Sequence, residues 1–470
     1  MTQKIDPNFL KHFFYVFGSQ LVVLLAGFIK ALLIPLFLGL SDYAYWQIYI
    51  FYTIYIGLFT FGYGDGLYLR YGGFKITDLP LHLMRTSNAI YLFLLGIGTT
   101  GLTLFAWANT DPYRQLVFIA IASNVIILGI TANISLTLQA TNQLKAYAFL
   151  NLADKVFFTL ALIPLVQENF RTFEYLILAD IGAKVMVMTI FLYRYRHLFI
   201  GTFSRLTTGA KEFCNSIKAG IQLLLANLTG MLVLGVGRII LEYFDTLDSY
   251  AYYSFALSLA NVVLVSITAL SIVIYPSLKR QARENYFVYY NTTSAAYVVF
   301  SLLMLTAYFP AVAFIELFAR QYMPVIDFLN VIFVITLLQG KMQLVNNTYY
   351  KALRLEKPMF VANFSSLLIV IIFSTVGFIQ TQSILAIAYA ALFTMLFLVY
   401  ASEMFLRRHM SGGYSFNFLL EILILGIFIL TSQILSSIPA AVVWIFLIAG
   451  IAVKNLSQLN VLWRKLRSGM

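Results

Sequence analysis

Residues 19–40 read SQLVVLLAGFIKALLIPLFLGL, an apolar run in which Lys30 is the one charged residue. A helix of about 20 apolar residues is long enough to cross the hydrocarbon core of a bilayer. The chain continues with SDYAYWQIY (41–49), where two polar residues lead into a second apolar run. This stretch therefore predicts two consecutive transmembrane helices separated by a very short turn.

The composition of the whole chain agrees with that prediction. Of its 470 residues, 61% are hydrophobic and 11% are charged, and the mean hydropathy is +0.85. A soluble globular domain has roughly 25% charged and about 45–50% apolar residues. Too few polar groups are present to cover a soluble surface, and disorder requires low hydrophobicity. The composition therefore excludes both classes and indicates a polytopic membrane protein.

Apolar runs of this length recur along the chain, and we predict about fourteen transmembrane helices. Continuous runs also exclude a transmembrane β-barrel, whose strands alternate over about ten residues. The first run is too long for the apolar region of a cleaved signal peptide, so we expect it to be retained. The predicted spans are 13–40, 44–66, 86–108, 115–139, 147–167, 173–195, 219–243, 250–276, 288–313, 323–348, 358–379, 383–404, 418–435 and 440–457.

The distribution of Lys and Arg predicts the orientation of these spans, because cytoplasmic loops carry an excess of both residues. With a cytoplasmic N-terminus, inside segments hold 23 of the 31 basic residues, and outside loops hold 3, namely Arg114, Arg171 and Arg320. We therefore expect both termini in the cytoplasm. In this assignment Glu403 and Glu421 count with the inside segments. The net charge of +12 then records topology and does not indicate a nucleic-acid partner.

The two halves of the chain contain similar sequences. SDYAYWQIY (41–49) corresponds to DSYAYYSFA (248–256), and each follows an apolar helix with a late basic residue, Lys30 or Arg238. The offsets are 207 and 208 residues. Six predicted spans separate the copies, so both enter the membrane from the same side. We therefore predict an all-α fold of two six-helix lobes in a parallel pseudo-repeat, followed by two C-terminal helices.

The longest connection, between the sixth and seventh spans, is the natural boundary between the lobes. We expect an N-lobe at 1–197, a cytoplasmic linker at 198–218, a C-lobe at 219–410, and the two added helices with a cytoplasmic tail at 411–470. The linker contains the one cysteine, Cys214, which allows no intrachain disulfide. The four His residues are scattered, so no metal site is predicted.

Two regions of the sequence carry a family resemblance. The first joins residues 19–40 to YAYWQIYIFYTIYIGLFTFGYGDGLYLRYGG (43–73). The second joins NLTGMLVLGVGRIILEYF (227–244) to YAYYSFALSLANVV and ends in SIVIYPSLKR (271–280). Both resemble the polysaccharide transporter branch of the MOP (multidrug/oligosaccharidyl-lipid/polysaccharide) flippase superfamily, which contains the Wzx-type O-antigen and exopolysaccharide repeat-unit flippases. The branch often has Gly at the position of Ala44.

This resemblance implies two six-helix lobes around a central cavity that opens alternately to each side of the membrane. It also implies movement of a polyprenyl-diphosphate-linked oligosaccharide, with undecaprenol as the lipid, to the outer leaflet of the bacterial cytoplasmic membrane. The membrane lipids and a polysaccharide polymerase machinery are then the expected partners. The chain has no G-x-x-x-x-G-K-[ST] loop, so we expect no nucleotide hydrolysis and predict no cofactor.

Basic residues within the spans are candidates for a phosphate-binding site. Each charge at bilayer depth costs about 2.5–3.5 kcal/mol and usually faces a partner or a water-filled cavity. Lys30 and Arg238 occupy matching positions in the two halves, and a phosphate prefers positive charge where little water competes. We therefore predict that Lys30, Arg238 and Lys341 bind the diphosphate. The alternative is a buried inter-helix ion pair, such as Lys30 with Asp154 or Asp180.

Three acidic residues within the spans, Asp65, Asp154 and Asp180, are candidates for ion or proton coupling. The alternative for each is structural pairing. Asp180 lies four positions before Lys184, so the two can neutralise one another on one helix face. For Asp65 the local partner would be Arg70.

Helix geometry gives an expectation for four further charged residues. Arg238 and Glu242 also have i,i+4 spacing and can pair locally. Asp154 and Lys155 are adjacent and point about 100° apart on a helix, so we expect each to have a separate partner.

Tyr45, Tyr49 and Tyr52 form one stripe along the second predicted helix. A tyrosine combines an apolar ring with a hydroxyl, so the three residues are candidate sugar contacts; ordinary helix packing is the alternative. Pro35 lies five residues after Lys30 and predicts a bend in the first helix, where it is a candidate hinge.

Other functions remain open. A multidrug/cation antiporter of the same superfamily would favour an acidic cavity, whereas the charged residues that we assign to neither side of the membrane are five basic and four acidic. The sequence does not separate a peptidoglycan-precursor or teichoic-type flippase from the leading interpretation. A membrane-embedded polysaccharide polymerase or ligase would need a catalytic site on a sizeable outside loop, and the predicted outside loops are short and contain no His. We therefore predict a transporter and not an enzyme.

Overall fold

The computed structural model describes residues 22, 25–168, 170–279, 285–410, 417–434, 439 and 442–444. In these residues the regular structure is helical, and nine helices are long and apolar enough to cross a membrane. Two shorter apolar helices, Leu25–Phe37 and Glu421–Ile434, fall within the first and thirteenth predicted spans. Most of the fourteenth predicted span, 440–457, and the predicted tail lie outside the described residues. The all-α, multi-pass fold class is therefore confirmed.

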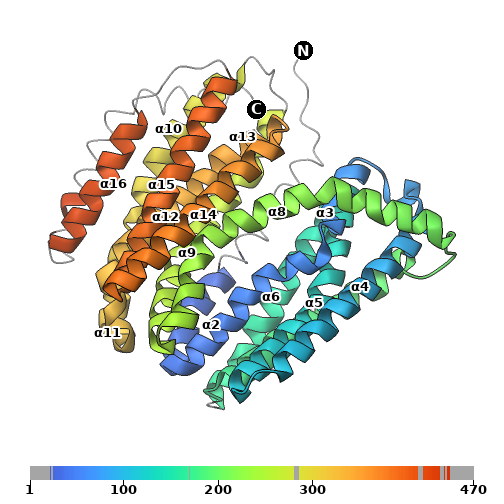
Figure 1. Ribbon diagram of the computed structural model, residues 1–470, viewed down its shortest axis with the longest axis horizontal. Coiled ribbons are helices and arrows are strands. Elements are labelled where there is room, and N and C mark those ends of the chain that lie inside the picture. The colour runs from blue at the N-terminus through green and yellow to red at the C-terminus, as the bar shows by residue number, and fades with distance from the viewer. Residues whose placement is uncertain are drawn as a thin grey trace. The chain divides into compact units, whose positions relative to one another are not determined.

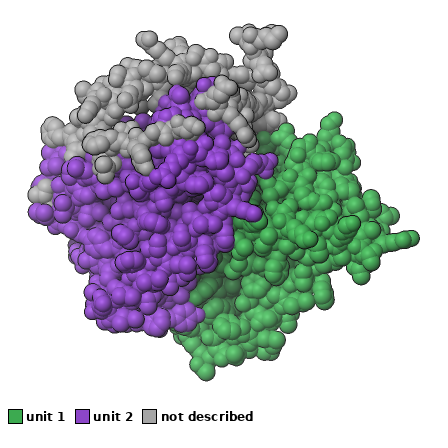
Figure 2. Space-filling view, turned by 45° about the horizontal axis from the view of Figure 1, so that its top comes forward, with its two compact units in different colours: residues 1–228 green, residues 229–470 purple. Residues whose placement is uncertain are grey.

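The chain forms two compact units, unit 1 (Met1–Leu228) and unit 2 (Thr229–Met470), which Figure 2 shows in different colours. The boundary falls inside helix α8, Leu206–Phe244, which therefore contributes residues to both units. The predicted lobe boundaries around the linker at 198–218 stay a prediction.

Unit 1 is a bundle in which α5 is the central helix. It packs on α2, α4 and α7, while α6 packs mainly on α7. After Leu25–Phe37, the elements are α2 (Leu40–Ile54), η1 (Tyr55–Thr60), α3 (Tyr63–Tyr71), η2 (Ile76–Asp78), α4 (Leu81–Trp107), α5 (Pro112–Ala140), α6 (Leu144–Gln167), α7 (Phe173–Arg194), η3 (Arg196–Leu198) and the first part of α8 (Figure 1).

Unit 2 is arranged around α12 in the same way. This helix packs on α9, on α10 and α11, and on α15, while α14 packs on α15. The elements after α8 are α9 (Leu247–Lys279), α10 (Tyr286–Leu305), α11 (Tyr308–Phe318), η5 (Arg320–Val325), α12 (Ile326–Lys341), the π-helical turn η6 (Met342–Asn346), α13 (Asn347–Ala352), α14 (Glu356–Thr381), α15 (Ile384–His409) and α16 (Asn417–Ile434).

The repeat predicted from the sequence agrees with the structure of each unit. The two copies lie at the beginnings of α2 and α9, and within them Tyr43, Ala44, Tyr250 and Ala251 are all buried. In each unit the fourth span packs on the second, the third and the sixth, and the sixth packs on the fifth. The similar sequences therefore begin elements that make equivalent contacts.

The second predicted span differs from the expected continuous helix. The chain breaks after η1, where Phe61 and Gly62 have positive φ angles of 51° and 74°. Gly62 approaches the first part of α8 so closely that a Cβ atom would lie 2.7 Å from a backbone atom of Gly220. Glycine provides both the backbone conformation and the space for this crossing. The break is thus a requirement of tertiary packing.

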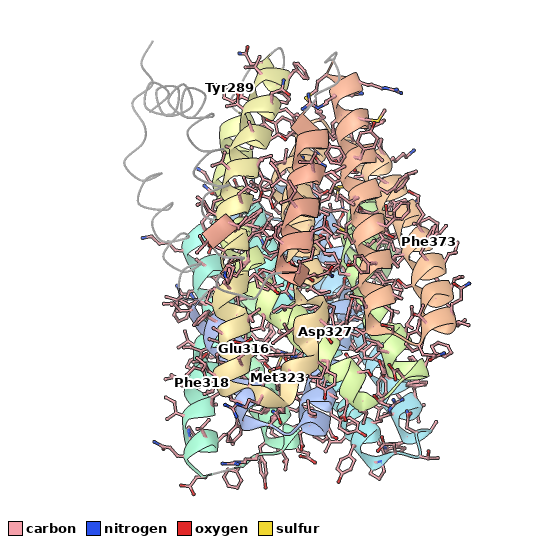
Figure 3. The ribbon with its side chains drawn as sticks, turned by 90° about the vertical axis from the view of Figure 1, so that its left-hand side faces the viewer. Tyr289, Glu316, Phe318, Met323, Asp327 and Phe373 are labelled. Carbon is pink, nitrogen blue, oxygen red and sulfur yellow. The ribbon has the colours of Figure 1, made fainter. Side chains whose placement is uncertain are left out.

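The outward surfaces of the helices are apolar, as a bilayer requires. Phe93 on α4 is 69% exposed, and Phe373 on α14 is 51% exposed. Figure 3 shows Phe373 pointing away from the other helices of unit 2, and it places Tyr289 and Phe318 toward opposite ends of the unit. Large apolar side chains with this exposure are stable when the solvent is lipid. The protein is therefore a multi-pass membrane protein.

Candidate functional site

A cavity of about 310 Å³, lined by both polar and apolar side chains, lies between α5, α6 and α7 in unit 1. These helices are long and apolar enough to cross a membrane. The charged groups of the lining come from α6 and α7, and α5 contributes hydroxyl and amide groups. The polar and charged lining residues are Thr131, Ser135, Gln139, Asn151, Asp154, Lys155 and Lys184. We call this feature the unit 1 cavity.

Asp154 and Lys155 form an ion pair in the unit 1 cavity, with Nζ 2.6 Å from Oδ2. The expectation that each residue has a separate partner was wrong. Although the two side chains leave the helix in different directions, the long Lys155 side chain bends back to its neighbour. The second oxygen of Asp154, Oδ1, is buried and accepts no hydrogen bond from the described protein atoms. The Asp154 side chain is 20% exposed, so the cavity meets another part of this carboxylate while Oδ1 is enclosed by protein.

A buried network of hydrogen bonds and one ion pair adjoins the unit 1 cavity. Asp180 forms an ion pair with Lys184, which confirms the pairing expected from their i,i+4 spacing. The hydroxyl of Tyr49 donates to Asp180 at 2.7 Å and accepts from the side-chain amide of Asn124 at 2.9 Å. Since Asp180 is 5% exposed, these bonds compensate the cost of burying its charge. The network connects α2, α5 and α7.

Lys30 lies near this network. Its ammonium group is 3.7 Å from the centre of the Phe158 ring on α6, a cation–π contact. Asp180 and Asp154 both act electrostatically on Lys30. The structure thus brings together three of the residues selected from the sequence within unit 1. Pro35 is buried in the same short helix, and its role as a hinge stays a prediction.

Lys341 takes part in a buried charge cluster in unit 2. Its ammonium group is 3.1 Å from Glu403 on α15 and 2.5 Å from Glu421 on α16. Glu403 also accepts a bond of 2.9 Å from Arg407, one turn further along α15. The two basic and two acidic side chains balance one another. Lys341 therefore has the inter-helix ion pairs that were the alternative to phosphate binding.

The charge cluster adjoins an irregular segment. Directly after Lys341 the helix widens into the π-helical turn η6, a rare form that is frequent at functional sites. Its last residue, Asn346, accepts a hydrogen bond of 2.8 Å from Tyr290 on α10. The guanidinium group of Arg407 lies 5.4 Å from the ring centre of the same Tyr290. The irregular turn is thus held by α10 and α15.

Arg238 lies in the part of α8 that belongs to unit 2 and is 7% exposed. Close helix contacts surround this position. A Cβ atom at the neighbouring Gly237 would lie 2.7 Å from Ile387 and 2.8 Å from Tyr253. Its role in phosphate binding stays a prediction, as does that of Lys30.

The remaining aromatic candidates pack within unit 1. The Tyr45 hydroxyl donates to Asp111 at 2.9 Å, and its ring stacks on Phe173 with 5.0 Å between the ring centres. Tyr52 packs on Phe118, with 5.6 Å between the ring centres. Together with the bonds of Tyr49, these contacts agree with the packing alternative for the stripe. Sugar contact by these residues stays a prediction.

The sequence did not identify the partner of Arg70. Its guanidinium group forms an ion pair of 2.6 Å with Glu212 on α8, and Tyr71 donates to the same carboxylate at 2.6 Å. Although burial opposes its charge, the hydrogen bond and charge of Glu212 raise the pKa of Arg70 above its ordinary value. Asp65 lies in the first turn of α3, and its role in coupling stays a prediction.

The acidic residues of the unit 2 charge cluster were also missed. Glu403 and Glu421 were counted with the cytoplasmic segments, but they are 4% and 5% exposed and bind Lys341. A signal was present, because Glu403 falls inside the predicted span 383–404 and precedes Arg407 by one turn. Glu421 similarly falls inside the predicted span 418–435.

Comparisons with known proteins support the fold. No family model matches the chain, and no curated protein sequence matches it. Among solved structures, the lipid II flippase MurJ in an inward closed conformation matches with a TM-score of 0.68 and 13% identity, covering 97% of this chain and 99% of that chain. A P26A mutant of MATE matches with a TM-score of 0.52 and 11% identity, covering 85% and 96%. Both are members of the MOP superfamily, and this chain has their fold.

Proposed function

We propose that the protein is a flippase that moves a lipid-diphosphate-linked oligosaccharide from the inner to the outer leaflet of the bacterial cytoplasmic membrane, by alternating access, for surface polysaccharide synthesis. One observation carries the proposal: the unit 1 cavity places charged and hydrogen-bonding side chains among helices that can cross a membrane. Each charge at bilayer depth costs about 2.5–3.5 kcal/mol. A transporter needs such a cavity because the polar group of its substrate must cross the apolar core of the membrane.

The chemistry of the cavity lining suits a sugar headgroup. The hydroxyl and amide groups of α5 and α6 can donate and accept, and the partly exposed carboxylate of Asp154 can accept. Sugar hydroxyls pair with such mixed sets of donors and acceptors. We therefore assign the polar headgroup to this cavity and regard Tyr49, which donates to Asp180, as part of the scaffold behind it.

Lys30 and Arg238 are the proposed contacts of the diphosphate. Lys30 has a cation–π contact and lies close to the network of Asp180. Arg238 is the matching residue of the second half. Lys341 is not included, because Glu403 and Glu421 already neutralise it. The likeness to MurJ, a lipid II flippase, agrees with a lipid-linked substrate.

A reconstitution assay tests this proposal. The purified protein is placed in liposomes that contain undecaprenyl-diphosphate-linked N-acetylglucosamine with a dithionite-sensitive dye on the sugar. We expect dithionite to quench about half of the dye in empty liposomes and nearly all of it when the protein is present. Quenching at the level of empty liposomes, with protein that is folded and correctly incorporated, would refute the proposal.

The second candidate is a multidrug/cation antiporter. The observation that favours it is the carboxylate of Asp154, which lines the unit 1 cavity with a 20% exposed side chain and could bind a cationic group. The same liposomes distinguish the two candidates. An antiporter would accumulate ethidium in response to a proton or sodium gradient and would leave the lipid-linked sugar in place.

A further inference from the structure

A second cavity in unit 1, of about 420 Å³, lies at helix ends. It is formed where the turn between α5 and α6 meets the end of α7. The lining includes Gln143, Lys145 and Phe149 on one side, and Ile190, Arg194 and Tyr195 on the other. Since α5, α6 and α7 are long enough to cross a membrane, their ends lie at the boundary between lipid and water. We call this feature the helix-end cavity.

The charged lining of the helix-end cavity is entirely basic. Lys145 lies in the first turn of α6, and Arg194 lies in the last turn of α7. None of the lining residues is acidic. Basic pockets between transmembrane helices at this level bind anionic lipid headgroups, and Arg in particular binds phosphate through two parallel hydrogen bonds. The electrostatics therefore favour a phosphate.

The other part of the lining is apolar and open. Phe149 is 57% exposed and Ile190 is 41% exposed, and both lie on the membrane-crossing helices. The exposed ring of Phe149 packs on the buried ring of Phe191, with 6.0 Å between the ring centres, and this contact supports the apolar surface of Phe149 and Ile190. This surface continues from the basic end of the cavity along α6 and α7. A free phosphate would not use it, whereas an acyl chain would.

The walls of the cavity are held in place before any ligand binds. The Tyr195 hydroxyl donates to Gln143 at 3.1 Å and connects the end of α7 to the turn. The backbone N–H of Gln143 donates to Leu138 at 2.8 Å, and Asn142 has the positive φ of 58° that closes the turn. A site that is ordered in advance loses less entropy on binding.

We propose that the helix-end cavity binds an anionic membrane phospholipid, with its phosphate at Lys145 and Arg194 and an acyl chain against Phe149 and Ile190. This lipid is a bound component of the membrane, separate from the transported substrate, so the inference does not depend on the proposed function.

Native mass spectrometry of the full-length protein, released from mild detergent, tests the proposal. Phosphatidylglycerol is titrated against phosphatidylcholine, which has the same chains but a zwitterionic headgroup. We expect preferential retention of phosphatidylglycerol. In the Lys145→Gln, Arg194→Gln double variant its affinity should fall about thirtyfold, because each basic residue near the surface contributes about a factor of five.

Two controls keep the result interpretable. The Lys75→Gln, Arg205→Gln double variant removes the same charge at exposed positions outside the cavity, and it should bind phosphatidylglycerol as the wild type does. The Phe149→Ser variant should weaken the lipid and leave the binding of inorganic phosphate unchanged. Equal losses in both double variants, or displacement of the lipid by millimolar inorganic phosphate, would overturn the proposal.

Discussion

The ammonium group of Lys341 on α12 lies 3.1 Å from the carboxylate of Glu403 on α15, and the two side chains are 2% and 6% exposed. Glu421 on α16 completes the pairing. A basic residue that looks suited to an anionic substrate is thus used to hold three helices of unit 2 together. Its positive charge is neutralised inside the unit.

This relationship predicts a large loss of stability in the Lys341→Met variant. Removing one member of a buried ion pair leaves unpaired charge and costs about 3–5 kcal/mol. The unfolding free energy in mild detergent measures the effect. The control is Lys357→Met, which removes an exposed lysine and should have little effect.

A second substitution sharpens this test. The Lys341→Met, Glu421→Gln double variant removes one charge of each sign and leaves Glu403 with Arg407. We expect it to regain part of the stability lost in Lys341→Met. If the double variant is less stable than the single one, the charge cluster is not the cause of the loss.

The diphosphate assignment predicts that Lys30→Ala and Arg238→Ala each reduce transport in proteins that still insert and fold. Hydrogen bonds to charged groups contribute about 1.5–3 kcal/mol. The initial rate of dithionite-accessible flipping should therefore fall about 10- to 100-fold in each variant. Lys357→Ala is the matched control and should transport at the wild-type rate. Wild-type rates in both the Lys30→Ala and the Arg238→Ala variants would remove these residues from the substrate site.

The two ion pairs of unit 1 predict different costs for similar substitutions. Asp154 and Lys155 are partly exposed, at 20% and 40%, so Asp154→Asn should lower the unfolding free energy by less than about 1 kcal/mol. Asp180 is buried and bonded to both Lys184 and Tyr49, so Asp180→Asn should cost about 3 kcal/mol or more. Circular dichroism during thermal unfolding measures the loss of stability in each of the two variants. Equal costs would contradict the distinct environments.

Asp154 also provides a test of coupling. Because it lies in the unit 1 cavity, Asp154→Asn can change the response of transport to an imposed proton gradient without unfolding the protein. If Asp154 takes part in coupling, flipping by this variant should lose its dependence on the gradient. If flipping by this variant still depends on the proton gradient as in the wild type, Asp154 takes no part in coupling.

The crossing of α3 with the first part of α8 predicts that Gly66→Ala is severely destabilising. A Cβ atom at this position would lie 1.8 Å from the carbonyl oxygen of Ser216, so the backbones would have to separate. Gly182→Ala on α7 is the control, because its Cβ would meet nothing within 4 Å. The control should be neutral or stabilising by up to about 1 kcal/mol, since Ala is a better helix former. Yields of folded protein and melting temperatures measure the difference.

Local patterns predicted much of the structure. Apolar length predicted the positions of the membrane-crossing helices, and i,i+4 spacing predicted the pair of Asp180 with Lys184. Both depend on neighbours within one helix, whose geometry is known in advance. The expectation for Asp154 and Lys155 was wrong for a local reason too, because it ignored the flexibility of the lysine side chain.

By itself, the sequence determined that the chain is a membrane protein, because lipid requires long apolar helices with satisfied backbones and the sequence supplies them. It also determined the repeat and the charged candidates. Only the tertiary structure decided which charges are compensated by residues far away in the sequence. Lys341 pairs with Glu421, which is 80 positions away in the sequence, and Arg70 pairs with Glu212, which is 142 positions away. The partner of a buried charge depends on which helix faces meet, and packing sets those faces in three dimensions.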